Sequence, residues 1–133
     1  MTTYSSYPAY IFGAACVSRG VMASLWPREE YGHMGLPLEA DSAAAGDASA
    51  GLVSPLMYYK GIREISYGAT MVALQQQGLD KALTTFLGII SLVRFGDGLI
   101  VWRHGGPELR YRAWGHWITG AVFAGWVSWR WTR

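Results

Sequence analysis

The stretch Tyr58-Tyr59-Lys60-Gly61-Ile62-Arg63-Glu64 places three charged side chains at the start of a run that is otherwise apolar or small through Leu74. A helix that crosses a bilayer needs about 20 mainly apolar residues, and this run is close to that length. Charged groups at membrane depth are costly, so they usually face the interior of a helical bundle or a wet cavity. We therefore expect this stretch to decide both the fold and the position of a functional site.

The composition favours a membrane protein with one domain. Hydrophobic residues make up 51% of the 133 residues and charged residues only 15%, whereas roughly a quarter are charged in an average soluble domain. The mean hydropathy of +0.14 is low because the segment 27–54 is polar. A net charge of +2, spread along the chain, excludes a nucleic-acid-binding surface. The single cysteine, Cys16, excludes an internal disulfide.

Four apolar runs predict an all-α fold, a four-helix transmembrane bundle that forms a single membrane domain over residues 1–133. The expected helices lie at about residues 8–26, 55–77, 82–102 and 111–131. Tyr and Trp residues cluster near the ends of these runs, where amphipathic rings settle at a membrane interface. We expect an integral, multi-pass membrane protein, in the endoplasmic reticulum if the source is eukaryotic. The alternative is a soluble helical bundle that uses the same residues as its core.

The segment 27–54 is expected to be a mobile loop outside the membrane. Its part from Leu38 to Gly51 is rich in Ala, Ser, Asp and Gly, which cannot bury enough side chain to hold a fixed structure. A short surface helix in this Ala-rich part is the alternative.

Two further expectations concern the helices themselves. Small residues four apart let helix backbones approach closely, which predicts packing contacts at Ala14/Ser18, Ala69/Ala73 and Gly120/Ala124. The last run is expected to end in a basic tail that contains Arg130 and Arg133.

Ionisable residues in all four runs lie at a similar depth. At 1.5 Å per residue, they fall roughly 7 to 14 Å from the face that carries the long loop. These residues are Arg19, Lys60, Arg63, Glu64, Arg94, Asp97 and His116. The opposite half of each run has none until its boundary, so we expect a polar cavity that opens toward the loop.

The spacing of these residues suggests ion pairs within two of the helices. Lys60 and Glu64 are four apart, and Arg94 and Asp97 are three apart, so each pair can form on one helix face. The alternative to a functional role is that such pairs only fix the register of the helices.

Arg19 and Arg63 have no acidic partner at contact spacing on their own helices. They would have to share Glu64 or Asp97 across the bundle, or bind an anionic or carbonyl-bearing ligand. Because cations outnumber carboxylates at this depth, we favour a ligand.

The sequence predicts no metal site and no cofactor. The three histidines are dispersed and show no HxxH or HxxxH spacing. Gly96-Asp97-Gly98 falls within an expected helix and follows no strand, so it does not form a phosphate-binding loop. A bound quinone remains open.

Two motifs resemble the signature of a family of small four-helix membrane proteins, known as domain of unknown function 4267 and similar in outline to DoxX-like proteins. The first is Lys60-Gly61-Ile62-Arg63-Glu64, in which members often have Asp at the position of Glu64. The second is Gly96-Asp97 followed, after five residues, by Arg103-His104-Gly105. The resemblance covers about residues 55–131 and implies the fold but no established reaction. Fungal relatives look like accessory proteins of natural-product pathways.

The first functional hypothesis is a cofactor-independent isomerase or cyclase that acts on a lipophilic natural-product intermediate. A carboxyl group in an apolar cavity can keep its proton and act as an acid, whereas one beside an arginine stays ionised and acts as a base. Asp97 and Glu64 are expected to divide these catalytic roles, with His116 as a proton relay. The expected substrate-binding residues are Arg63, Arg94, Lys60, Arg19 and Tyr59.

The second hypothesis is a non-catalytic membrane protein, either an accessory subunit or a carrier for a lipophilic anion. Its expected partners are the lipid bilayer and either a pathway enzyme or a second copy of the chain.

Overall fold

Residues 5–39 and 51–132 are described by a computed structural model, and the chain is helical over most of these ranges. The elements in chain order are α1 (Tyr7–Leu25), α2 (Pro27–Met34), α3 (Pro55–Gln76), α4 (Asp80–His104), α5 (Gly106–Leu109), the 3-10 helix η2 (Arg110–Arg112) and α6 (Ala113–Trp131). The ends of the four long helices lie within two residues of the ranges expected from the sequence. The all-α fold class is confirmed for the described residues.

Proline marks the start of most of these helices. A proline fits the first turn because the backbone N–H groups there have no partner within the helix. The prolines in this position are Pro8, Pro27, Pro55 and Pro107. At α3 the side chain of Ser54 adds a cap, since it accepts a hydrogen bond from the Leu56 N–H.

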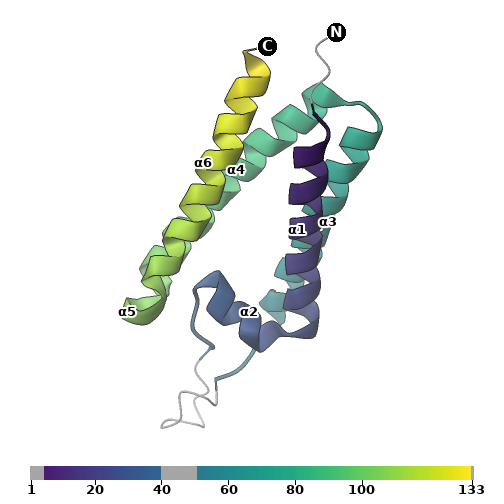
Figure 1. Ribbon diagram of the computed structural model, residues 1–133. Coiled ribbons are helices and arrows are strands. Elements are labelled where there is room, and N and C mark those ends of the chain that lie inside the picture. Colours follow the sequence, from purple (N-terminus) through teal and green to yellow (C-terminus); the bar gives the residue numbers. More distant parts are fainter. Residues whose placement is uncertain (1–4, 40–50, 133) are drawn as a thin grey trace.

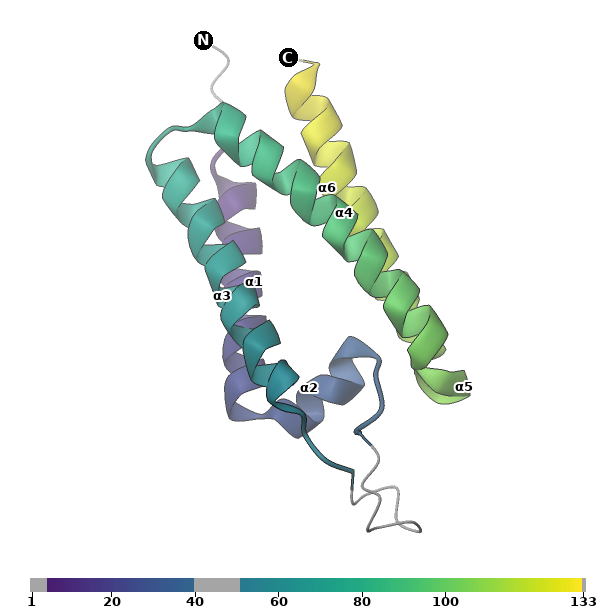
Figure 2. The same cartoon turned by 180° about the vertical axis from the view of Figure 1, so that it is seen from behind.

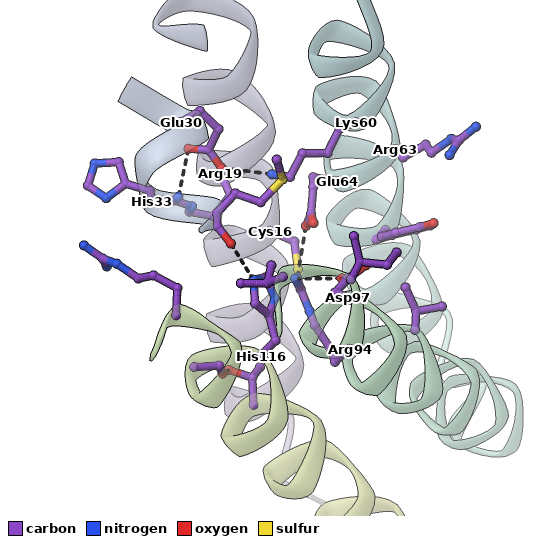
Figure 3. A pocket seen from close by; sticks show the side chains of 18 of the residues that line it. Cys16, Arg19, Glu30, His33, Lys60, Arg63, Glu64, Arg94, Asp97 and His116 are labelled. Atoms are coloured by element: carbon purple, nitrogen blue, oxygen red, sulfur yellow. Dashed lines mark hydrogen bonds and ion pairs between the residues drawn. The ribbon is translucent and has the colours of Figure 1, made fainter. Parts of the chain in front are cut away.

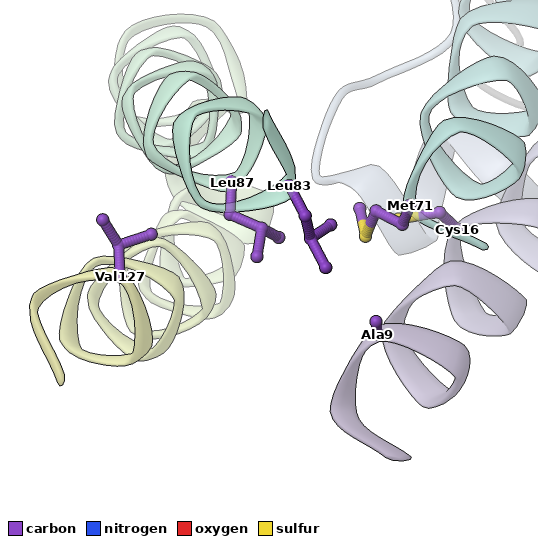
Figure 4. Packing of buried hydrophobic residues seen from close by; sticks show 6 residues of the cluster. All are labelled: Ala9, Cys16, Met71, Leu83, Leu87 and Val127. Carbon is purple, nitrogen blue, oxygen red and sulfur yellow. The ribbon is translucent and has the colours of Figure 1, made fainter. Parts of the chain in front are cut away.

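The long helices form two pairs, with α1 packed against α3 and α4 packed against α6 (Figure 1). Seen from behind in Figure 2, the chain turns from α3 into α4 where the two pairs meet, and the pairs diverge from there toward α2. We call these regions the meeting end and the open end. Buried side chains of both pairs pack together at the meeting end (Figure 4), among them Ala9, Met71, Leu83, Leu87 and Val127.

Glycines form the contact between α1 and α3. A Cβ atom at Gly20 would overlap the carbonyl oxygen of Gly61, and one at Gly68 would overlap that of Gly13. The two backbones therefore touch at two levels, separated by seven residues on each helix.

The small residues predicted to mediate helix packing are only partly used. Ala14, Ser18 and Ala69 are exposed, so the prediction is wrong for the pairs on α1 and α3. The reason is that glycine, which has no side chain, allows a closer approach than alanine or serine. On α6 the prediction holds for Gly120, which is buried against α4 with the Ser91 carbonyl oxygen 3.3 Å from where its Cβ would lie.

The segment after α1 departs from the expected loop. Pro27–Met34 forms the helix α2, which ends at Gly35 in the left-handed conformation (φ 96°). The buried Tyr31 hydroxyl accepts a hydrogen bond from the Ser54 N–H (3.0 Å). The expected loop is therefore wrong for residues 27–34, because tertiary contacts hold a helix that would be too short to persist alone. Residues 40–50 of the expected loop lie outside the described ranges.

Among the described helices, α4 is the one whose length and composition fit a membrane span, with a mean hydropathy of 1.5 over its most apolar window. A single helix of this kind gives weak support for a membrane location, since core helices of soluble proteins meet the same criterion. The finer expectation of four spanning helices is not confirmed.

Candidate functional site

A cavity of about 1010 Å³ lies between the two helix pairs, with residues of α2 in its wall. It is lined by side chains from α1, α2, α3, α4, η2 and α6, several of which are shown in Figure 3. All eight residues predicted from the sequence as catalytic or binding residues line it, namely Arg19, Tyr59, Lys60, Arg63, Glu64, Arg94, Asp97 and His116. The structure thus brings them to one place, and their chemical roles stay predictions.

The first group of charges centres on Glu30 of α2, and we call it the Glu30 group. Its carboxylate lies 2.8 Å from Nη2 of Arg19 and 2.9 Å from Nζ of Lys60. The Glu30 side chain is only 1% exposed, so these two cations replace the water that it has lost. Lys60 therefore pairs with α2 and not with Glu64 on its own helix, and Arg19 draws its partner from the expected loop.

The second group centres on Arg94 of α4, and we call it the Arg94 group. Its Nη2 lies 3.2 Å from Oε2 of Glu64 on α3, and its Nη1 lies 3.6 Å from Oδ2 of Asp97. The spacing of three residues between Arg94 and Asp97 thus forms a pair as expected. One guanidinium serves two carboxylates here, which differ in exposure: the Glu64 side chain is 8% exposed and that of Asp97 is 36% exposed.

His116 connects α6 to the end of α2. Its Nε2 lies 2.9 Å from the backbone carbonyl oxygen of Met34, which can only accept, so the Nε2–H donates. Carbonyl groups in the last turn of a helix lack partners within the helix, and His116 supplies one for α2. If the ring is neutral, its Nδ1 is left free to accept a proton.

Tyr59 and Arg63 line the cavity from exposed positions. In Figure 3 the Arg63 side chain points away from both ion-paired groups. Within the described ranges it makes no ion pair, so its charge remains available at the rim.

The lining residues that were not predicted as site residues include two charged ones, Glu30 and Arg112, and a histidine, His33. The sequence analysis placed Glu30 and His33 in a loop. Proline at position 27 with acidic residues at positions 29 and 30 is a helix-start pattern. Negative charge in the first turn is stabilising there, because the N-terminal end of the helix dipole is positive. That pattern could have revealed α2 and, with it, Glu30.

The cavity carries more positive than negative charge. Its lining includes five cationic side chains, Arg19, Lys60, Arg63, Arg94 and Arg112, and three carboxylates, Glu30, Glu64 and Asp97. All three carboxylates are engaged in ion pairs. In residues 5–39 and 51–132, no three His, Cys, Asp or Glu side chains are grouped as they would be around a metal ion.

The fold and the cavity define a class of small all-α proteins in which two helix pairs enclose a charged pocket. The chain belongs to the family described as Domain of unknown function (DUF4267), which matches residues 13–130. This confirms the resemblance inferred from the two motifs, and the matched region includes every residue that lines the cavity except Phe12. Neither a curated protein nor a solved structure matches the chain.

Proposed function

We propose that the protein is a membrane enzyme that transfers protons on a lipophilic substrate, as an isomerase or a cyclase. The observation that carries this proposal is the Arg94 group, in which Glu64 and Asp97 share one guanidinium in the wall of a cavity. One ionised carboxylate is enough to balance Arg94. The other carboxyl can hold a proton and pass it to a ligand.

The difference in exposure assigns the two carboxyls different tasks. Asp97, the more exposed of the two, is the group that reaches the substrate, and Glu64 supplies the ionised partner that holds Arg94 in place. General acid–base catalysis of this kind contributes about 10²- to 10⁴-fold to a rate. Arg94 and Lys60 stabilise negative charge that develops on a substrate oxygen.

The outer surface of the helices supports a membrane location with all four long helices spanning. Large apolar side chains are exposed on each of them, including Ile11, Ile62, Leu92 and Ile118 at 61% to 70% exposure. Exposed apolar surface of this extent marks contact with lipid or a partner. Exposed aromatic residues stand near both ends, with Tyr7 and Trp131 at one and Tyr111 and Trp114 at the other, as at membrane interfaces.

The proposal is tested by identifying the substrate and then following its protons. The intermediate that accumulates when the gene is deleted is incubated in D₂O with membranes that contain only this protein. We expect conversion with deuterium incorporated at the rearranged carbon, and loss of both in Asp97→Asn and Glu64→Gln. Glu108→Gln, an exposed carboxyl on α5 outside the cavity lining, is the control and should retain activity. Full activity in both cavity variants contradicts the proposal.

A second function, binding without catalysis, is favoured by the surplus of two cations in the cavity. A carrier or an accessory subunit would leave the accumulated intermediate unchanged. It would instead co-purify with that intermediate, with a pathway enzyme or as a homo-oligomer.

A further inference from the structure

The cavity changes from polar to apolar along its length. Phe12 lies seven residues before Arg19 on α1, and Phe123 lies seven residues beyond His116 on α6, so each is about 10 Å nearer the meeting end. The two phenylalanine rings touch edge to face, with centroids 4.8 Å apart, and Ile90 of α4 lines the same region. The cavity thus has charged groups near α2 and an apolar floor toward the meeting end.

The charged part of the cavity is not neutral by itself. The Glu30 group holds two cations against one carboxylate, and the Arg94 group holds one cation against two, so together they balance. Arg63 and Arg112 remain, and neither has a carboxylate partner among the described residues. The Nε of Arg112 is also buried with no hydrogen-bond partner within the described part of the chain.

A ligand has to match both properties. Positive charge that is removed from water without a counter-charge is costly, so a neutral ligand would leave the half-buried guanidinium of Arg112 uncompensated. Arg63, exposed at the rim, adds a second positive charge that a neutral ligand would not use. A carboxylate offers two oxygens in the plane that a guanidinium fork recognises. An apolar chain of matching length would displace water from the phenylalanine floor. Pockets for drug-sized ligands measure about 300 to 1,000 Å³, so this cavity is large enough for a long-chain molecule.

We infer that the ligand is an amphiphilic anion, an apolar chain that ends in a carboxylate, with its head near α2 and its chain directed toward Phe12 and Phe123. The inference rests on the proposed function and narrows it to a substrate class.

The test uses the whole protein in phosphatidylcholine nanodiscs and a photoreactive probe, hexadecanoic acid with a diazirine at the far end of its chain. The matched probe is the same molecule as its uncharged carboxamide. We expect the acid to label the protein about tenfold more than the amide at equal concentration, because a charge-assisted hydrogen bond is lost in the amide. The adducts should map by mass spectrometry to the segments around Phe12 and Phe123.

Variants assign the preference to the surplus arginines. Arg63→Gln and Arg112→Gln should each reduce labelling by the acid severalfold and leave labelling by the amide unchanged. Arg103→Gln is the control, since Arg103 is exposed at the end of α4 and does not line the cavity. If a variant fails to fold, the ratio of acid to amide labelling on the unaltered protein still decides.

Equal labelling by acid and amide overturns the inference, and so do adducts confined to α2 or to the outer helix faces. A further arm replaces part of the phosphatidylcholine with phosphatidylglycerol, whose anionic group is a phosphodiester. Loss of labelling would show that the cavity prefers a phosphate headgroup and would overturn the choice of a carboxylate, whereas unchanged labelling supports it. Labelling requires no turnover. If the acid probe labels the protein preferentially but the intermediate that accumulates on gene deletion is not converted, the enzyme proposal fails and this inference still holds.

Discussion

The meeting end and the cavity each bury an arginine that bridges helices, and the two arginines differ in what they face. At the meeting end the Arg130 side chain is fully buried. Its Nε donates to Oγ1 of Thr84 (2.7 Å), and its Nη2 lies 2.9 Å from Oδ1 of Asp80. None of these three residues lines the cavity. One fully buried cation meets one carboxylate, that of Asp80, which is 41% exposed, and the pair links α6 to the start of α4 as a structural clamp.

Arg94 is partly exposed and lies between two carboxylates on the wall of the cavity. A buried ion pair therefore indicates chemistry only where it holds more charge than neutralisation needs and where a ligand can reach it. Four substitutions test this distinction.

The largest effect is expected for Asp97→Asn. Turnover should fall by about two to four orders of magnitude because the transferable proton is lost. The free energy of unfolding should change little, since Glu64 still balances Arg94. The measurements are initial rates and equilibrium unfolding of the same preparation. A loss of stability that matches the loss of rate would show that Arg94 and Arg130 serve the same structural purpose.

Arg130→Met should do the opposite. Loss of the hydrogen bonds from Arg130 to Thr84 and Asp80 should cost about 2 kcal/mol of stability. The cost is lower than for a pair buried on both sides, because the Asp80 side chain is 41% exposed and can be rehydrated. Turnover per folded molecule should stay unchanged, because the cavity is elsewhere. Unfolding in denaturing detergent, together with activity normalised to folded protein, measures both. Unchanged stability would contradict the clamp.

Glu30→Gln should lower stability by about 2 kcal/mol, since Arg19 and Lys60 lose their counter-charge. It should also speed trypsin cleavage after Arg28, because α2 is no longer anchored. Glu29→Gln is the matched control, as the exposed neighbouring carboxylate should contribute no more than about 0.5 kcal/mol. Equal effects of the two substitutions would argue against the Glu30 group.

His116→Ala should have the smallest effect on stability, about 1 kcal/mol, because the Met34 carbonyl loses its donor. His116→Gln keeps an N–H donor and is expected to restore most of this loss. If both variants unfold alike, the hydrogen bond from α6 does not hold α2.

The long helices could be predicted because each combines an apolar run with a definite boundary. Pro8 and Pro55 start α1 and α3, and the charges on those runs fall on helix sides that face the cavity. Side-chain spacing on a helix is fixed by its geometry, so convergence on one cavity followed from the sequence.

The ion-pair partners could not be predicted in the same way. Lys60 is four residues from Glu64, yet it pairs with Glu30, which local spacing cannot reveal. Eight residues of mainly polar character give no apolar pattern, and α2 exists only through tertiary contacts such as those of Tyr31. Arg130, expected in a basic tail, is buried for a similar reason: its partner Asp80 is 50 positions away along the chain. Arg133 of that expected tail lies outside the described residues.

The glycine contacts between α1 and α3 have a consequence for ligand size. Where the main chains of α1 and α3 touch directly, no side chain can change its rotamer to adjust the contact. This pair therefore behaves as a rigid unit. We therefore expect a bulkier ligand to be accommodated by movement of α4 and α6 relative to α1 and α3, and not by separation of α1 from α3. The range of ligand sizes that the protein accepts would then depend on the angle between the two helix pairs more than on the side chains of α1 and α3.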